Sequence, residues 1–291
     1  MTASQNTNRS AVTLIEVLVA IFVMGIGLIC LLTLFPLGAM RMAAAFKDER
    51  AAQAAVNART IAAAKNLRGD SAVLPKFKNP GGLQDADDTG PSYPVLVDPV
   101  GAVQSGMLGS NIARVGPSYA PDGSAAYQGY FGLLDDVTFQ RGFGVPKQFG
   151  IRIERETLYT WAYLLQRPRM GDPTVTNATV CVFQRRPKAG ALDKEFPAAM
   201  NPLDNTITVS YAGNAPNIQP GMWVLDGSVK APNKYAFGNF YRITGVRDVS
   251  ATQLALDLQT PLLGYGTAPF AGGQVVILDG LVEVFEMGPG R

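Results

Sequence analysis

One long uncharged apolar run near the N-terminus constrains this chain more than any other feature. No residue from Val17 to Met40 carries a charge, and the preceding residues 1–10 are polar with one basic side chain, Arg9. About 20 apolar residues are enough for a helix to cross a bilayer, so this run predicts a membrane-spanning helix. A cleaved secretory signal has an apolar core of only about 7–15 residues. The run is too long for that class of signal.

One acidic residue, Glu16, interrupts the apolar pattern that begins at Ala11. A carboxylate costs up to about 2.5–3.5 kcal/mol inside a membrane helix and less near the interface. Two interpretations follow from the residue alone. Glu16 either marks the point where the membrane begins, or it has a cationic partner that offsets its burial.

The sequence around Glu16 favours the second interpretation. Residues 11–20 read AVTLIEVLVA, which resembles the class III signal of type IV pilins and type II secretion pseudopilins. In that family prepilin peptidase cuts after a small residue, the new N-terminus is methylated, and an acid four residues further on is retained. The resemblance implies a leader peptide at residues 1–11, processing between Ala11 and Val12, and Glu16 as the retained acid. Ala11 stands where the family usually has Gly, and Val12 where it usually has Phe.

The new N-terminus suggests a partner for the acid. Val12 would carry a cationic amine about one helical turn from Glu16. An isolated amine and an isolated carboxylate are each costly in lipid, but each neutralises the other. If the amine belongs to a neighbouring subunit, the pair fixes the axial stagger of packed helices, which is the role that the resemblance implies for Glu16.

Helix-breaking residues lie inside the apolar run. Gly25 and Gly27 are in its middle, and Pro36 follows near its end. Proline removes one helical hydrogen bond and kinks or locally unwinds a helix. Gly and Pro are also common in membrane helices generally. The resemblance implies a further role in assembly, with Gly25 and Pro36 bounding a stretch that unwinds in a filament.

The helical pattern continues beyond the membrane run. After Met40 the chain is rich in alanine, the best helix former, and no Gly or Pro occurs before Gly69. The sequence predicts one helix over residues 12–68, with residues 12–40 as its transmembrane and assembly half. The second half must leave the membrane and pack against a folded domain.

The region after the helix predicts loops and then strands. Residues 69–156 are rich in Gly and Pro, and two β-branched and aromatic runs follow at Leu158–Gln166 and Thr179–Arg185. We expect these runs to be adjacent antiparallel strands laid on the helix, with one apolar face that contains Trp161 and Tyr163. Residues 69–200 would therefore form a variable loop region and a pilin-like sheet.

The last part of the chain also predicts β-structure. Short apolar runs recur between Gly/Pro turns through residues 201–291, which favours a meander or a small barrel. Asp279–Gly280 lies between two such runs and predicts a two-residue hairpin. Whether this region is a separate module stays open.

The residue inventory offers little for catalysis or metal binding. The chain has no histidine, which removes the Ser-His-Asp and Cys-His arrangements and the commonest metal ligand. Cys30 in the apolar run cannot approach Cys181 closely enough for a disulfide, so we expect two free thiols. Asp85, Asp87 and Asp88 could offer oxygen ligands, but the calcium-loop pattern with its closing Glu is missing. A solvated acidic loop is the favoured interpretation.

The paired carboxylates and the net charge also give no support for catalysis or for nucleic-acid binding. Neither Asp135–Asp136 nor Glu154 with Glu156 has neighbours that would assign acid and base roles. The formal net charge of +2 gives no broad electrostatic case for nucleic acid. We expect a protein that is not an enzyme and has no cofactor, no metal site and no nucleic-acid partner.

These observations together predict an α+β, pilin-like fold: a long N-terminal helix packed on an antiparallel β-sheet, with a further β-rich C-terminal region. The expected role is a structural subunit of a type IV pilus or pseudopilus, and the chain length favours a minor pilin. Its partners would be prepilin peptidase, other pilin subunits, the cytoplasmic membrane and an assembly platform. It would span the inner membrane once, with the C-terminal domain outside the cytoplasm, before joining a filament.

Two alternatives remain open. A pseudopilin of type II secretion would use the same chemistry in a different machine. A membrane-anchored binding or adhesion module would never polymerise, and such a module would tolerate loss of the Glu16 carboxylate.

Overall fold

The computed structural model describes most of the chain as two compact units, residues 1–49 and residues 50–291. The described residues are 14–81, 83, 85–98, 106–109, 111–119, 130–133, 137–140, 152–155, 158–184, 186, 194–230 and 235–290. Within these, residues 137–140, 152–155, 230 and 235–236 are described by their backbone alone. Each unit is described by itself.

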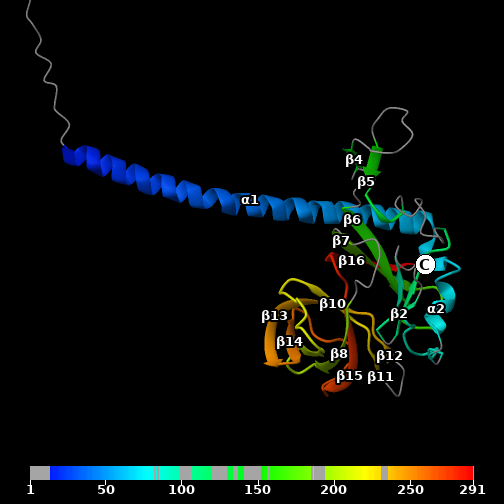
Figure 1. Ribbon diagram of the computed structural model, residues 1–291. Helices are drawn as coiled ribbons and strands as arrows, with labels where there is room; N and C mark the ends of the chain where they lie inside the picture. Colours follow the sequence, from blue (N-terminus) through cyan, green and yellow to red (C-terminus); the bar gives the residue numbers. More distant parts are fainter. Residues whose placement is uncertain are drawn as a thin grey trace, which may run out of the picture. The chain divides into compact units, whose positions relative to one another are not determined.

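A single helix, α1 (Leu14–Ala64), forms the described part of the first unit and continues into the second (Figure 1). Its 51 residues would extend roughly 75 Å at 1.5 Å per residue. It ends because Asn66 adopts a left-handed conformation with φ of 47°, which asparagine tolerates better than most residues. The helix therefore stops at Ala64, four residues before the predicted end, and a 3₁₀ turn, η1 (Leu67–Gly69), follows.

A six-stranded mixed sheet is the central layer of the second unit, with strand order β16-β7-β6-β1-β3-β2. Neighbouring strands are antiparallel except β1 and β3, which are parallel, so the expected purely antiparallel sheet is wrong in this one pair. β1, β2, β3 and the short helix α2 (Leu74–Lys78) come from the Gly/Pro-rich region where we expected loops. The strands are β1 (Val95–Val97), β2 (Gly106–Leu108), β3 (Ile112–Val115), β6 (Tyr159–Gln166), β7 (Thr176–Gln184) and β16 (Leu281–Gly290).

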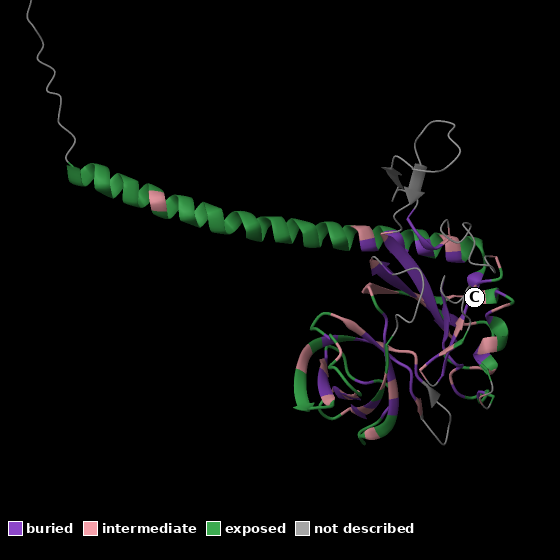
Figure 2. Ribbon diagram, viewed as in Figure 1, coloured by how far each residue is buried: buried purple, intermediate pink, exposed green. Residues whose placement is uncertain are grey.

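β6 and β7 pair antiparallel as predicted, but both of their faces are buried. Trp161, Tyr163 and Leu165 of β6 point into a core that they share with α1. Ala162 and Leu164, which alternate with them, point into a second core on the opposite face. The expectation of a single apolar face was therefore wrong, because a second layer covers the other face. Figure 2 shows these strands mostly in the colour of buried residues.

Small side chains let α1 lie close to the first face of the sheet. Tyr163 Oη donates a hydrogen bond to the Ala58 carbonyl at 2.9 Å and accepts one from Trp161 Nε1 at 3.0 Å. Both side chains are almost fully buried, so their polar atoms must be satisfied inside the protein. The buried helix residues are Ala51, Ala54, Ala55, Ala58 and Ala62.

Helix arginines bind the edge strand of the sheet. Arg59 Nη2 donates to the Glu286 carbonyl at 2.7 Å, and Arg68 Nη2 donates to the Gly288 carbonyl at 2.8 Å. Both carbonyls belong to β16, which is an outer strand of the sheet. Unpaired groups on an edge strand invite pairing with another chain, and these two bonds occupy part of that edge.

A closed six-stranded barrel covers the second face of the sheet, with strand order β10-β13-β14-β9-β8-β15. The barrel lies within residues 194–277, and β16 belongs to the mixed sheet, so residues 201–291 are not one structural element. Two short ladders, β4 (Val137–Gln140) with β5 (Arg152–Arg155) and β11 (Val229–Lys230) with β12 (Tyr235–Ala236), lie outside both sheets. The barrel strands are β8 (Lys194–Asn201), β9 (Thr206–Ser210), β10 (Trp223–Asp226), β13 (Phe240–Ser250), β14 (Gln253–Leu258) and β15 (Phe270–Ile277).

The turn at Asp279–Gly280 does not form the predicted hairpin. β15 pairs with β8 and β10 in the barrel, whereas β16 pairs with β7 in the sheet. Gly280 has φ of 75°, as a tight turn requires, and its carbonyl accepts a hydrogen bond from the Gln184 N–H at 2.8 Å. The turn therefore transfers the chain from one sheet to the other.

The barrel and the sheet are joined by an apolar core and by one buried amide. Leu225 and Val276 of the barrel share a core with Leu164 and Phe183 of the sheet. Asn111, which is fully buried, donates through Nδ2 to the carbonyls of Ser228 at 2.9 Å and Phe237 at 3.0 Å. These contacts fix the barrel on the sheet.

A buried ion cluster closes the end of β1. Asp98 is fully buried, and it accepts hydrogen bonds from Arg114 Nη2 at 2.7 Å and Arg186 Nη2 at 3.1 Å. The Arg186 guanidinium also lies 4.0 Å from the centre of the Phe183 ring. Charged groups are tolerated in such a place only when they are paired and hydrogen-bonded.

A second buried acid, Asp226, lies in the barrel. Its carboxylate accepts a hydrogen bond from Tyr265 Oη at 2.7 Å and one from the Ser228 N–H at 3.0 Å. Burial raises the pKa of Asp226 to about 6, although these hydrogen bonds act in the opposite direction. The folded chain therefore holds a proton on Asp226 more tightly than the unfolded chain does.

The Tyr163 contact predicts the effect of removing one hydroxyl group. Tyr163→Phe deletes the bond to Ala58 and leaves the buried Trp161 Nε1 without its acceptor. We expect a loss of about 1–3 kcal/mol in the free energy of unfolding, measured by urea denaturation of the detergent-solubilised chain. Tyr211→Phe, at a half-buried barrel tyrosine, is the control and should change stability by less than about 0.5 kcal/mol. Equal free energies of unfolding for Tyr163→Phe and Tyr211→Phe would contradict the hydrogen bonds assigned to Tyr163.

Asp226 predicts a defined pH dependence. Because burial raises its pKa in the folded chain to about 6, the contribution of Asp226 to the free energy of unfolding is full below the ordinary aspartate pKa of 3.8 and is lost as the pH rises through about 6. The difference in unfolding free energy between wild type and Asp226→Asn should change by roughly 3 kcal/mol between about pH 3 and about pH 7, since each pKa unit is worth about 1.4 kcal/mol. Denaturation at a series of pH values measures this difference, and a constant difference would refute it.

Candidate assembly site

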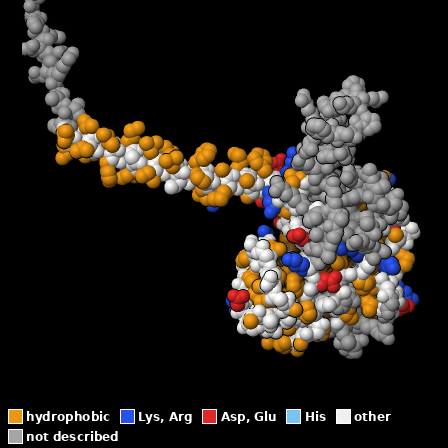
Figure 3. Space-filling model, viewed as in Figure 1, with side chains coloured by type: hydrophobic (Ala, Val, Ile, Leu, Met, Phe, Trp, Pro, Cys, Tyr) orange, Lys and Arg blue, Asp and Glu red, His pale blue; other side chains and the backbone are white. Residues whose placement is uncertain are grey.

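The first unit carries a long apolar surface that nothing in the unit covers. Along α1 before Ala51 the described side chains are exposed, apart from two half-buried positions, with values of 81 % for Leu14 and 79 % for Phe35. Figure 3 shows hydrophobic side chains along this part of the helix. Soluble proteins rarely expose a contiguous apolar patch larger than a few hundred Å². By length and composition, α1 is the one helix in the described part of the chain that could cross a membrane.

Glu16 lies in the first turn of α1. A negative charge there interacts favourably with the positive end of the helix dipole. The predicted processing residues, Ala11 and Val12, lie outside the described residues. The structure therefore places Glu16, the acid predicted to be retained, in the first turn of the described helix and leaves its pairing with Val12 as a prediction.

The glycines of the apolar segment are not required by packing within the chain. A Cβ atom added at Gly25 or Gly27 would meet no heavy atom within 4 Å, and the same is true of Gly38. Small residues at such positions let a neighbouring helix approach closely in a membrane. The predicted assembly residue Gly25 is thus placed on an open helix surface.

Pro36 lies inside α1, and the helix is continuous through it. Proline has no N–H, so the carbonyl one turn earlier lacks its usual helical donor. Nearby, Thr33 Oγ1 donates a hydrogen bond to the Cys30 carbonyl at 2.8 Å. The segment between Gly25 and Pro36 is helical here, and its unwinding in a filament remains a prediction.

The apolar surface gives way to a polar one in the middle of α1. Charged side chains begin at Arg41 and cluster at residues 47–50, immediately before the first buried alanine, Ala51. This order places the change from exposed apolar surface to charged surface where the helix enters the folded unit. It agrees with a membrane segment that continues into a packed segment.

The structure describes the surroundings of the other candidate residues. Cys30 and Cys181 are both free thiols, as expected, and burial raises the pKa of Cys181. Asp85 forms an ion pair with Lys78 at 3.4 Å, and Asp87 accepts a hydrogen bond from the Thr89 N–H at 3.0 Å. Over the described residues, no three His, Cys, Asp or Glu side chains are grouped so that they could hold a metal ion.

The predicted carboxylate pairs are outside what the structure describes. Asp135, Asp136 and Glu156 lie outside the described residues, and Glu154 is described by its backbone alone. The interpretation of these groups as solvated therefore stays a prediction.

One feature escaped the sequence analysis, a groove between the barrel and the sheet. Its lining residues include Trp223, Asn239 and Thr179, which come from separate parts of the chain. No local spacing relates these residues, so no sequence pattern could have assembled them. The half-buried Trp223 alone offered a weak indication, since a large aromatic side chain outside a core often contacts a partner.

Comparison with known proteins supports the interpretation of the N-terminal segment. The model of a family described as the prokaryotic N-terminal methylation motif matches residues 6–29. The chain therefore carries a class III prepilin signal of the type IV pilin and pseudopilin family. The match covers the processing residues, Glu16 and Gly25, but not the folded unit.

The other two comparisons carry no argument about the folded unit. No curated protein matches the chain significantly. Among solved structures, the Phage phi92 endosialidase is similar at 10 % sequence identity with a TM-score of 0.22. The match spans 52 % of this chain and 20 % of that chain. A TM-score this low supports no conclusion about fold or activity.

Proposed function

We propose that this chain is a structural, non-catalytic subunit of a type IV pilus or a pseudopilus-like filament. Prepilin peptidase would remove residues 1–11, and the mature chain would wait in the inner membrane as a single-pass protein. Its folded unit would lie outside the cytoplasm. The observation that carries the proposal is the prepilin signal at residues 6–29 at the start of an exposed apolar helix.

The chemistry of α1 supports assembly through this helix. Its apolar surface requires either lipid or other helices, and exchange of one for the other costs little because both are apolar. A specific register then has to come from polar or small residues. Glu16, Gly25 and Pro36 are the residues proposed for this role, and other subunits of the same family are the proposed partners.

The barrel supports the more specific role of a minor subunit. Residues 50–64 of α1 and the barrel contact opposite faces of the sheet, so the barrel leaves this part of the helix uncovered. A subunit built in this way can pack through its helix and still present an additional module. We therefore favour a minor pilin over a major one, and it should be scarce in sheared filaments.

Two other roles fit the same N-terminal signal. A pseudopilin of type II secretion would be processed and assembled in the same way, and the neighbouring genes would distinguish it. A membrane-anchored binding module that never polymerises is the second alternative. Such a module does not require the Glu16 carboxylate, whereas a filament subunit does.

Processing predicts a defined N-terminus. Mass spectrometry of the protein from bacterial membranes should show a chain that starts at Val12 and carries one additional methyl group. Ala11→Leu should leave the leader attached, because the resemblance implies a small residue before the cut. Ala3→Leu makes the same change inside the leader and should be processed normally. An intact Met1 in the wild type, or a cut after the apolar run, would contradict the proposal.

Assembly predicts a specific requirement for the Glu16 charge. Glu16→Gln keeps the shape of the side chain but removes the carboxylate, so it should lower incorporation into sheared filaments at least about tenfold, the equivalent of about 1.4 kcal/mol. The amount of protein in the membrane should stay unchanged.

Glu49→Gln is the matched control, since it removes an acid from the charged segment of the same helix. It should assemble like the wild type. Normal incorporation of Glu16→Gln would reject the subunit model and leave the anchored binding module.

A further inference from the structure

A groove runs between the barrel and the mixed sheet. One cavity of about 440 Å³ lies between β10 and β13 on the barrel side and β7 and β16 on the sheet side. A second cavity of about 230 Å³ adjoins it and shares Thr179, Gly238, Asn239 and Glu286 with it. Small-molecule sites usually occupy about 300–1,000 Å³. Because they share these lining residues, the two cavities form one adjoining space that has room for more than one small ring.

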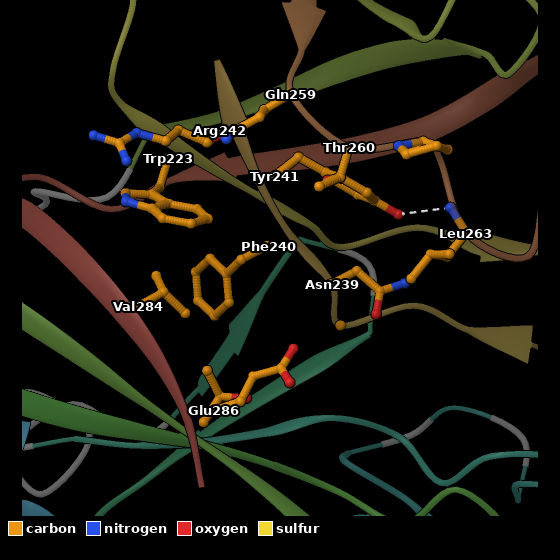
Figure 4. A pocket seen from close by; sticks show the side chains of 13 residues that line it. Trp223, Asn239, Phe240, Tyr241, Arg242, Gln259, Thr260, Leu263, Val284 and Glu286 are labelled. Atoms are coloured by element: carbon orange, nitrogen blue, oxygen red, sulfur yellow. Dashed lines mark hydrogen bonds between the residues drawn. The ribbon is translucent and has the colours of Figure 1, made fainter. Parts of the chain in front are cut away.

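One end of the groove is aromatic. In Figure 4 the rings of Trp223 and Phe240 lie together at this end, with Val284 of β16 close by. The Arg242 guanidinium lies 5.8 Å from the centre of the Trp223 ring, directly across the strand pair. Trp223 is half-buried and is not part of the barrel core. Its Nε1 atom is buried and has no hydrogen-bond partner in the described part of the chain, so the side chain is held by packing rather than by a hydrogen bond there.

The other end of the groove is polar but carries little charge. Planar amide side chains line it: Asn239 lies at the junction of the two cavities, and Gln166 and Asn177 lie in the second cavity. Glu286 of β16 belongs to both cavities. An amide side chain can donate to one hydroxyl group and accept from another, and a carboxylate accepts from both.

This lining argues against peptides and nucleic acids. An extended peptide would bind by adding to the edge of β16, but Arg59 and Arg68 already occupy its Glu286 and Gly288 carbonyls. A nucleic acid needs several cations, whereas Arg242 is the single cation among the described residues that line the two cavities. Its guanidinium lies 4.0 Å from the Glu283 carboxylate.

The combination fits a sugar chain. Sugar C–H groups carry a slight positive charge and stack on the negative face of an aromatic ring, and their hydroxyl groups match planar amides. We propose that this groove binds an uncharged oligosaccharide, with Trp223 as the stacking platform and Asn177, Asn239 and Glu286 as hydroxyl partners. The proposal stands independently of the filament role, because the groove lies wholly within the folded unit.

The two tryptophans of the chain make the test direct. Trp161 is 1 % exposed in the sheet core, whereas Trp223 lines the groove. The full chain, held in a detergent without a sugar headgroup, is titrated with neutral tri- to pentasaccharides of glucose, galactose, mannose or N-acetylglucosamine. At least one of these should change the tryptophan fluorescence and bind with a dissociation constant below about 1 mM by calorimetry.

Variants assign the binding to the groove. Trp223→Ala should weaken the affinity at least about tenfold and abolish the fluorescence change. Asn177→Ala, at an exposed strand position, should weaken it by a smaller factor. Tyr211→Ala removes a half-buried aromatic side chain of the barrel outside the groove and should bind like the wild type. Circular dichroism melting of each variant checks that it is folded.

Two outcomes would overturn the proposal. The first is that no sugar of the panel binds to the folded wild-type chain. The second is binding that Trp223→Ala and Tyr211→Ala affect equally, which would place the sugar elsewhere. If Trp223→Ala fails to fold, Trp223→Phe replaces it, and this variant should lose the fluorescence change while keeping a ring in the groove.

Discussion

The docking of an alanine face on a sheet is the contact on which the rest of this structure depends. Tyr163 Oη accepts a hydrogen bond from the indole N–H of Trp161 and donates one to the Ala58 carbonyl, so Trp161 is satisfied by Tyr163 and Tyr163 by the helix backbone. Alanines allow this approach because any larger side chain would hold the helix away from the Tyr163 hydroxyl. The contact sets where along α1 the folded unit begins, and hence how much of the helix stays outside its core.

α1 covers one face of the sheet. Because side chains alternate along each strand, the remaining apolar side chains point to the opposite face, which must also be covered. Ala162 and Leu164 of β6 point away from the helix, and exposing them with their neighbours would leave a large apolar surface in water. The barrel covers this surface, and Asn111 fixes its position with two hydrogen bonds. The chain then returns through β16, where Arg59 of α1 binds the Glu286 carbonyl and Arg68 of the following 3₁₀ turn binds the Gly288 carbonyl. Helix, sheet and barrel therefore form three successive layers of the second unit.

This layering separates two kinds of surface. The apolar surface of α1 before Ala51 has the chemistry of a membrane and assembly segment, and it carries the prepilin signal. The groove beside Trp223 is formed by the barrel and the sheet, and its aromatic and amide lining has the chemistry of a recognition site. The two proposals together describe a subunit that assembles through the apolar surface of α1 and binds a ligand in the groove.

The sequence by itself determined the structural features that depend on residues close together in the chain. The uncharged run, the motif around Glu16, the long helix and the pairing of β6 with β7 follow from composition and short-range periodicity. Tertiary structure decided everything that depends on distant partners: the parallel pair of β1 and β3, the burial of both sheet faces, and the groove. The turn at Asp279–Gly280 shows the difference, because its positive φ was encoded locally while its strands pair in different sheets. Local energetics fix a turn or a helix, whereas strand pairing is chosen by burial of surfaces far apart in the chain.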